Sequence, residues 1–186
     1  MLQTVLCGAA CAAAAYLLGS LSFSIIVTRL LYHKDIRTFG SGNAGMTNVL
    51  RTFGKGAAAL TIVGDIGKGI LAVLLAKWAF GAFTAADPIY GAYIAAFCAV
   101  LGHVYPVYFG FKGGKGILVS VAVLMTVEWI PACILLGIFI IVVALTRYVS
   151  LGSCIAAVCY PVTILVYSLI TGDPCVWINV ILSALI

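Results

Sequence analysis

Charged residues are scarce in this sequence. Only 8% of its 186 residues are Asp, Glu, Lys or Arg, whereas a soluble domain carries about a quarter. Hydrophobic residues make up 65% of the chain and the mean hydropathy is +1.25. Segments that alternate strictly between polar and apolar residues, which a membrane β-barrel requires, are also missing. The composition therefore predicts a helical integral membrane protein.

A basic N-terminal region is missing as well. The first Lys or Arg is Arg29, which follows a long apolar stretch from Leu2. A secretory signal peptide begins with basic residues, so we expect the first segment to be a retained membrane span. The net charge of +5 does not indicate nucleic-acid binding, because the basic residues lie between apolar segments rather than along one polar face with interleaved aromatics.

The cysteines form no C-x-x-C pair and have no nearby histidine, so the ligand spacing of a metal site is missing. All seven lie in or beside apolar segments, at Cys7, Cys11, Cys98, Cys133, Cys154, Cys159 and Cys175. We interpret them as small hydrophobic residues, and we expect no metal and no cofactor.

Continuous apolar segments predict the membrane helices. They cover residues 2–31, 56–80, 88–108, 116–129, 131–146, 151–171 and 174–186. Turn residues mark three breaks, at Asp87-Pro88, at Trp129-Ile130-Pro131 and at Gly172-Asp173-Pro174. The expected fold is all-α: a polytopic membrane helix bundle of about seven transmembrane helices, forming a single domain over residues 1–186.

The basic residues predict the orientation. Eight of the ten Lys and Arg residues fall in or next to the connections after the first, third and fifth segments. Near the connections after the second, fourth and sixth segments there is only Lys77. Because cytoplasmic loops carry the excess of Lys and Arg, we expect the N-terminus outside and these three connections in the cytoplasm. All three contain unusual polar or glycine-rich clusters, which favours one shared site.

The first cluster, the polar loop (residues 39–51), concentrates hydroxyl, amide and glycine residues ahead of an arginine. Short hydrogen-bonding groups and a planar guanidinium suit a phosphate. The alternative is a helix cap at the membrane boundary with a solvated arginine. The candidates are Ser41, Gly42, Asn43, Thr47, Asn48 and Arg51.

The second cluster, the glycine loop (residues 111–116), contains Lys112, Gly113, Gly114, Lys115 and Gly116. Glycines let successive N–H groups approach an anion, and the lysines add charge, although a positive turn with flexible glycines is an equal alternative. The third cluster places Arg147 beside Ser150 and Ser153, and by itself it resembles an interfacial cap.

Three further residues carry charge or can titrate within apolar segments. Asp65 and Lys68 are three residues apart on one helical face, so we expect an ion pair that either supports the site or fastens helices together. His103 is the obvious base by residue type, but no acid lies close to it in sequence. No nucleophile elbow or paired histidine and acid is present in the sequence.

At these residues the sequence resembles the bacterial membrane acylphosphate:glycerol-3-phosphate acyltransferases. The matching stretches occur in order along nearly the whole chain. They are Gly40-Ser41-Gly42-Asn43 with Thr47-Asn48 and Arg51, Gly64-Asp65 with Lys68-Gly69, Gly102-His103 with Pro106, residues 111–116, and Arg147-Tyr148 with Ser150-Leu151.

The resemblance implies transfer of a fatty acyl group from acyl phosphate to the 1-hydroxyl of glycerol 3-phosphate, which gives lysophosphatidic acid without an acyl-enzyme. It also implies a multi-pass protein of the bacterial cell membrane, an active site facing the cytoplasm, and transient contact with the soluble enzyme that makes acyl phosphate. Family members usually continue past the last span into a polar tail, which this sequence does not include. The rival hypothesis is a small transporter or channel for an anionic metabolite.

On the matching positions we assign roles in three groups. Catalytic roles go to Ser41, Arg51, Lys115 and Ser150. Substrate-binding roles go to Gly42, Asn43, Thr47, Asn48, His103, Lys112, Gly113, Gly114, Gly116 and Arg147. Asp65 and Lys68 are expected to support these residues from behind.

Overall fold

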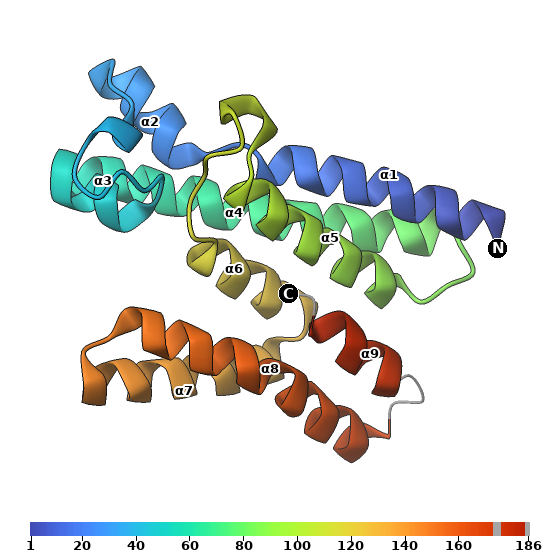
Figure 1. Cartoon of the computed structure of the whole chain (residues 1–186). Coiled ribbons are helices and arrows are strands. Elements are labelled where there is room, and N and C mark those ends of the chain that lie inside the picture. Colours follow the sequence, from blue (N-terminus) through green and yellow to red (C-terminus); the bar gives the residue numbers. More distant parts are fainter. Residues whose placement is uncertain (173–175, 185–186) are drawn as a thin grey trace. The chain divides into compact units, whose positions relative to one another are not determined.

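The structure is a computed structural model that describes residues 1–172 and 176–184 (Figure 1). Every regular element within these residues is a helix, as the sequence predicts. The chain divides into two compact units, Met1–Val123 and Leu124–Ile186. The first unit contains the polar loop, the glycine loop and the charged residues Asp65 and Lys68.

Three long helices form the body of the first unit. α1 (Leu2–Gly19), α4 (Lys55–Phe83) and α5 (Pro88–Val104) all pack against one another (Figure 1). α5 presents Ala92, Ala95, Ala96 and Ala99 to this contact, and all four are fully buried. Small side chains at this spacing lie along one face of a helix and let membrane helices approach closely.

The first predicted helix is broken in the structure. We expected one helix over residues 2–31, but α1 ends at Gly19 and α2 (Phe23–Tyr32) begins after Ser22. The break lies among buried serines: Ser20, Ser22 and Ser24 are all fully buried. Serine hydroxyls compete with the backbone for hydrogen bonds, and the Oγ atoms of Ser22 and Ser24 lie 3.1 Å apart. The break frees the Leu21 carbonyl for a side chain of α4.

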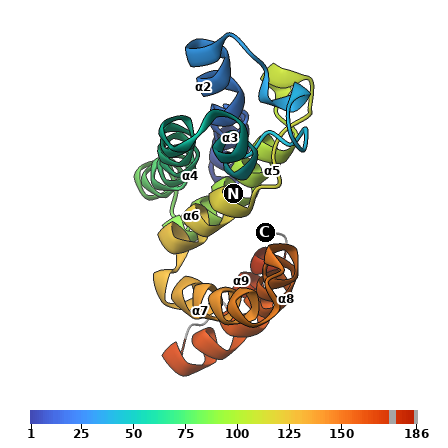
Figure 2. The same ribbon diagram turned by 90° about the vertical axis from the view of Figure 1, so that its left-hand side faces the viewer.

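The polar loop is partly helical, which the sequence interpretation missed. A short 3-10 helix, η1 (Ile36–Thr38), precedes the loop, and α3 (Met46–Phe53) occupies its second half and lies beside α4 (Figure 2). Met46, Val49 and Phe53 point into a small core, since their spacing places them on one helical face. Gly54, with a φ of 87°, separates α3 from α4.

α5 (Pro88–Val104) begins at the predicted Asp87-Pro88 turn and ends before the glycine loop. Asp87 caps α5 by accepting a hydrogen bond from the Ile89 N–H at 2.8 Å, with Pro88 in the first turn. The predicted helix over 88–108 stops at Val104, and η2 (Val107–Phe109) follows Pro106. The glycine loop then leads into α6 (Ile117–Val127).

The second unit consists of α7 (Trp129–Thr146), α8 (Val149–Thr171) and α9 (Val176–Ser183), with α8 packed against both neighbours. Leu135, Tyr160 and Ile164 form its buried core. Arg147, in the left-handed conformation with a φ of 63°, ends α7. Gly172 ends α8, while Asp173 and Pro174 of the predicted break, and Cys175, lie outside the described residues.

Among the described residues, five helical stretches are long and apolar enough to cross a membrane. They are Leu2–Tyr32, Lys55–Phe83, Pro88–Phe109, Trp129–Thr146 and Val149–Thr171. α6 is apolar but shorter, and α9 is shorter still. The chain is therefore a multi-pass membrane protein by composition and length, and the number of seven spans and the orientation stay predictions.

Candidate functional site

Asn48 organises the polar loop. Its Oδ1 accepts a hydrogen bond from the Ser41 N–H at 3.1 Å, and its Nδ2 donates to the carbonyls of Phe39 at 2.9 Å and Asn43 at 3.1 Å. The side chain is only 3% exposed. Asn48 was predicted to bind substrate, but its amide is occupied by the backbone that it folds. We therefore assign it to the scaffold of the loop.

The loop that Asn48 shapes presents other polar side chains outward. Ser41 and Gly42 are exposed, and Asn43 is partly buried. Thr47 and Arg51 lie four residues apart on the exposed face of α3. Within the part of the chain that the structure describes, the Arg51 guanidinium makes no hydrogen bond or ion pair, so its fork is available to a ligand.

The glycine loop is built differently from the prediction. We expected the N–H groups of Gly113 and Gly114 to face an anion, but they donate to the carbonyls of Val104 at 3.1 Å and His103 at 3.2 Å. These bonds satisfy two carbonyls at the C-terminal end of α5. A Cβ at Gly113 would clash with the His103 carbonyl, and one at Gly114 with the His103 ring. Both residues are glycine because the loop is pressed against α5.

The cations of the glycine loop remain exposed beside the start of α6. Lys112 and Lys115 are exposed, and neither ammonium has a partner among the described residues. Gly116, with a φ of 81°, directly precedes Ile117, the first residue of α6. The first N–H groups of a helix have no partner within it and favour an anion. Lys115 is two residues before α6 and exposed, so its side chain is available to an anion at this helix end.

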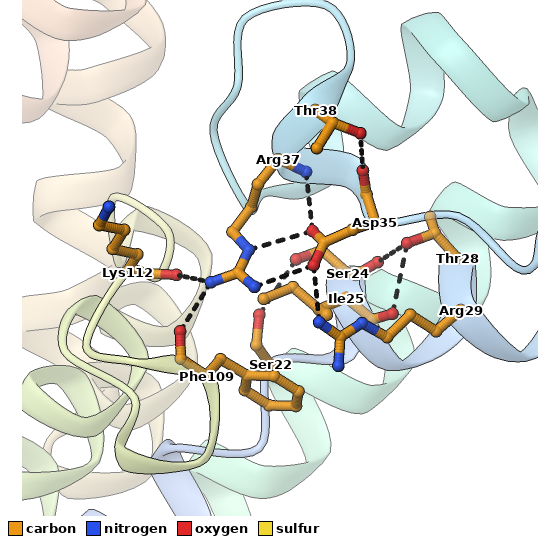
Figure 3. Close-up of polar contacts among 10 residues, drawn as sticks. All are labelled: Ser22, Ser24, Ile25, Thr28, Arg29, Asp35, Arg37, Thr38, Phe109 and Lys112. Atoms are coloured by element: carbon orange, nitrogen blue, oxygen red, sulfur yellow. Dashed lines mark hydrogen bonds and ion pairs between the residues drawn. The ribbon is translucent and has the colours of Figure 1, made fainter.

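The polar loop and the glycine loop touch each other. A Cβ at Gly114 would lie 2.6 Å from the Ala44 carbonyl oxygen, so the two backbones are in contact there. Phe109 packs against the small core that contains Val49 and Ala44. The Arg37 Nη1 atom donates to the carbonyls of Phe109 at 2.6 Å and Lys112 at 3.3 Å (Figure 3). Two predicted clusters thus converge within one unit.

Arg37 is itself held by a carboxylate. Its Nε and Nη2 atoms donate to the two oxygens of Asp35 at 3.0 and 2.9 Å, and Arg29 donates to Asp35 at 2.8 Å (Figure 3). The hydrogen bond from the Arg37 side chain holds the pKa of Asp35 well below its usual range, and Asp35 in turn raises the pKa of Arg37. Sequence reasoning counted Arg37 only as a topological charge, because no helical spacing links it to residues 109 and 112.

A second charged group lies behind the glycine loop. Lys68 Nζ lies 2.9 Å from Asp65 Oδ1, which confirms the predicted ion pair, and both side chains are 2% exposed. Lys68 also donates to the Leu21 carbonyl at 2.7 Å and contacts His103 Nδ1 at 3.0 Å. The structure brings Asp65 to 3.6 Å from His103, an acid that sequence proximity did not reveal.

The third predicted cluster belongs to the other unit. Arg147 and Ser150 are exposed, at the end of α7 and in the first turn of α8. The Ser153 hydroxyl donates to the Val149 carbonyl at 3.0 Å, which is the local bond of a helix residue. Ser150 and Arg147 are therefore open to a ligand on their own unit, and their meeting with the first two clusters stays a prediction.

The first unit can hold anions at a polar edge of an apolar body. Its paired cations are Arg29 and Arg37 with Asp35, and Lys68 with Asp65. Arg51, Lys112 and Lys115 have no such partner among the described residues. Unpaired cations on touching loops are what a doubly charged phosphate requires.

Comparison with protein families matches nearly the whole chain. Residues 9–186 match the family described as glycerol-3-phosphate acyltransferase. Curated proteins named glycerol-3-phosphate acyltransferase are similar in sequence. The one from Clostridioides difficile is 45% identical over 81% of this chain and 74% of its own length. The one from Coxiella burnetii is 42% identical over 85% of this chain and 77% of its own length.

The fold is similar to that of a crystallised integral membrane glycerol 3-phosphate acyltransferase, PlsY. Its glycerol 3-phosphate form superimposes with a TM-score of 0.75 and 32% sequence identity, over 96% of this chain and 85% of that chain. The lysophosphatidic acid form gives a TM-score of 0.73 at 31% identity, with the same coverage.

Proposed function

Because the chain belongs to the glycerol-3-phosphate acyltransferase family, we propose that it transfers a fatty acyl group from acyl phosphate to the 1-hydroxyl of glycerol 3-phosphate, forming lysophosphatidic acid. The acceptor and the product correspond to the two forms in which PlsY was crystallised. The donor and the mechanism are our proposal. The reaction is the first acylation of phospholipid synthesis.

The observation that carries the proposal is the set of unpaired cations on two loops in contact. Glycerol 3-phosphate and acyl phosphate both bring phosphate charge to one place, and that charge needs fixed cations. Arg51 on α3 and Lys112 and Lys115 on the glycine loop are exposed and unpartnered among the described residues. The bidentate fork of Arg51 suits one phosphate, while Lys115 beside the start of α6 suits another.

Direct attack by the substrate hydroxyl is the simplest chemistry for this site. Acyl phosphate is a mixed anhydride, so its phosphate is already a good leaving group. The hydroxyl oxygen forms the ester bond to the carbonyl carbon, the bond from that carbon to the phosphate oxygen breaks, and the leaving phosphate takes the hydroxyl proton. The protein then needs to position both substrates and neutralise charge.

The remaining predicted residues take supporting roles in this proposal. Ser41 and Thr47 extend the binding surface around Arg51 with hydroxyl donors, and Gly42 and Asn43 form the backbone next to Ser41. Ser150 and Arg147, on the second unit, stay predicted site residues. The apolar helices supply the surroundings that a fatty acyl chain prefers.

We further propose that the site faces the cytoplasm of the bacterial cell. The eight Lys and Arg residues of three connections support this orientation. A cytoplasmic site would receive acyl phosphate from a soluble enzyme that makes it, through a transient contact.

The decisive experiment supplies purified protein in detergent or nanodiscs with radiolabelled glycerol 3-phosphate and one acyl donor at a time. We expect labelled lysophosphatidic acid with acyl phosphate and none with acyl-CoA. Product from acyl-CoA alone would contradict the donor. Uptake of label into vesicles without acylation would instead favour the transporter hypothesis. An acyl-enzyme trapped with donor alone, or ping-pong kinetics, would contradict direct attack.

A further inference from the structure

The backbone of the glycine loop is costly to order, and it depends on hydrogen bonds to other parts of the chain. Four of the seven residues from Gly110 to Gly116 are glycines, and a backbone rich in glycine loses much entropy when it is ordered. On the α5 side the loop is tied by the N–H groups of Gly113 and Gly114. The donor to its Lys112 carbonyl comes from another part of the chain.

Arg37 supplies that donor. Its Nη1 atom donates to the carbonyls of Phe109 and Lys112, while Nε and Nη2 remain bound to Asp35 (Figure 3). One planar guanidinium therefore joins the segment before the polar loop to the glycine loop, across more than 70 positions of the sequence. The bond to the Phe109 carbonyl is partly buried, whereas the bond to the Lys112 carbonyl is exposed.

Arg29 offers a comparison within the same cluster. It donates to the same Asp35 carboxylate, but its side chain is 52% exposed. Its Cζ lies 5.6 Å from the centre of the Phe109 ring, a cation–π contact. Among the described residues Arg29 makes no side-chain bond to a glycine-loop carbonyl, so the two arginines share an ion pair and differ in the carbonyl bonds.

We propose that Arg37 is a positioning residue for acyl transfer: it fixes the glycine loop against the polar loop, so that Lys112 and Lys115 meet the phosphate groups in a set geometry. This inference rests on the proposed function for the identity of the anion. The hydrogen bonds from Arg37 to the Phe109 and Lys112 carbonyls, which we call the Arg37 clasp, can however be tested without turnover. Asp35 completes it by orienting the guanidinium fork.

Hydrogen exchange tests the clasp directly. The wild type is compared with Arg37→Gln, with Arg37→Lys and with the control Arg29→Gln, all in the same nanodiscs. We expect exchange of residues 107–116 to rise about tenfold or more in Arg37→Gln, because the loop loses hydrogen bonds from a charged donor. Arg37→Lys should behave similarly, since a compact ammonium cannot keep the fork geometry. Arg29→Gln should stay within about twofold of the wild type, because an exposed ion pair contributes little.

Kinetics then separates positioning from general structural damage. In Arg37→Gln we expect KM for one or both phosphorylated substrates to rise about tenfold while kcat falls by less than about threefold, the pattern of lost binding geometry. Unchanged exchange of residues 107–116, or equal changes in Arg29→Gln, would overturn the proposal. If Arg37→Gln does not fold, Arg37→Lys carries the same comparison. A wild type that is inactive with every donor but shows the expected exchange pattern would refute the proposed function and not the clasp.

Discussion

Lys68 Nζ on α4 lies 3.0 Å from His103 Nδ1 on α5, and both side chains are buried. The same ring nitrogen lies 3.6 Å from Asp65 Oδ1, so the buried ion pair surrounds Nδ1. The same Nζ donates to the Leu21 carbonyl at the break between α1 and α2. This arrangement gives His103 a role in packing the buried ion pair, and we therefore expect that it is not the general base.

The first prediction follows from this contact. His103→Gln keeps an acceptor for Lys68, and we expect kcat to fall by less than about tenfold, rather than by the 10²–10⁴-fold typical of a lost general base. The exposed His33→Gln serves as the control. The measurement is turnover of acyl phosphate across a range of pH. A loss of four orders of magnitude in kcat would restore histidine as the base.

A second prediction concerns the buried ion pair. Lys68→Met removes the ammonium that pairs with the buried Asp65 carboxylate, so we expect a loss of about 3–5 kcal/mol in stability. The double variant Lys68→Met, Asp65→Leu should recover a large part of it. Thermal unfolding in detergent measures both, with Lys77→Met as the control, because Lys77 has no ion-pair partner among the described residues. A single variant as stable as the wild type would contradict the role of the pair.

The third prediction tests the unpaired cations. Arg51→Ala and Lys115→Ala should each lower acyl transfer by about 10²-fold or more, the effect of removing one preorganised donor from a charged site. Arg51→Lys should also be impaired, because it loses the bidentate fork. All three should unfold within a few degrees of the wild-type temperature, since these exposed side chains make no hydrogen bond or ion pair among the described residues. Near-normal turnover would remove the substituted residue from the site.

A pH dependence follows from Asp35. Its pKa is lowered chiefly by the hydrogen bond from the Arg37 side chain. The stabilisation is therefore complete above the unfolded pKa of about 4 and is lost as the pH falls toward the lower folded value. We expect the unfolding temperature of the wild type to exceed that of Asp35→Asn at pH 7, and the difference to shrink between about pH 4 and pH 2. A difference that grows on acidification would contradict this.

The final prediction concerns orientation. Single cysteines at Ser41, Lys112, Lys115 and Ser150, in a background without native cysteines, should react with an impermeant thiol reagent only when the cytoplasmic side is accessible. The basis is the asymmetry of Lys and Arg between the two sides. Labelling from outside intact cells would reverse the topology and separate the clusters from cytoplasmic substrates.

Several local features followed from the sequence because they depend on neighbours. Asp65 and Lys68 are three residues apart, so one helical turn was enough to predict their ion pair. Asp87-Pro88 predicted the start of α5, because a side-chain cap and a first-turn proline act within two residues. α3 was missed although Met46, Val49 and Phe53 share a face, because the polar residues of this short segment dominated its interpretation.

By itself the sequence determined the helical membrane class and the family, and it placed the long helices to within a few residues except for the break between α1 and α2, which it missed. The length of apolar segments, the turn residues and the order of motifs can all be read from the sequence without knowing how the helices pack. Only the tertiary structure decided that Gly113 and Gly114 turn their N–H groups back to α5, that Asn48 is occupied by its own loop, and that Arg37 joins residues 109 and 112. The physical reason is that a hydrogen bond between distant backbone carbonyls and one side chain depends on how helices pack, and no local spacing encodes that packing.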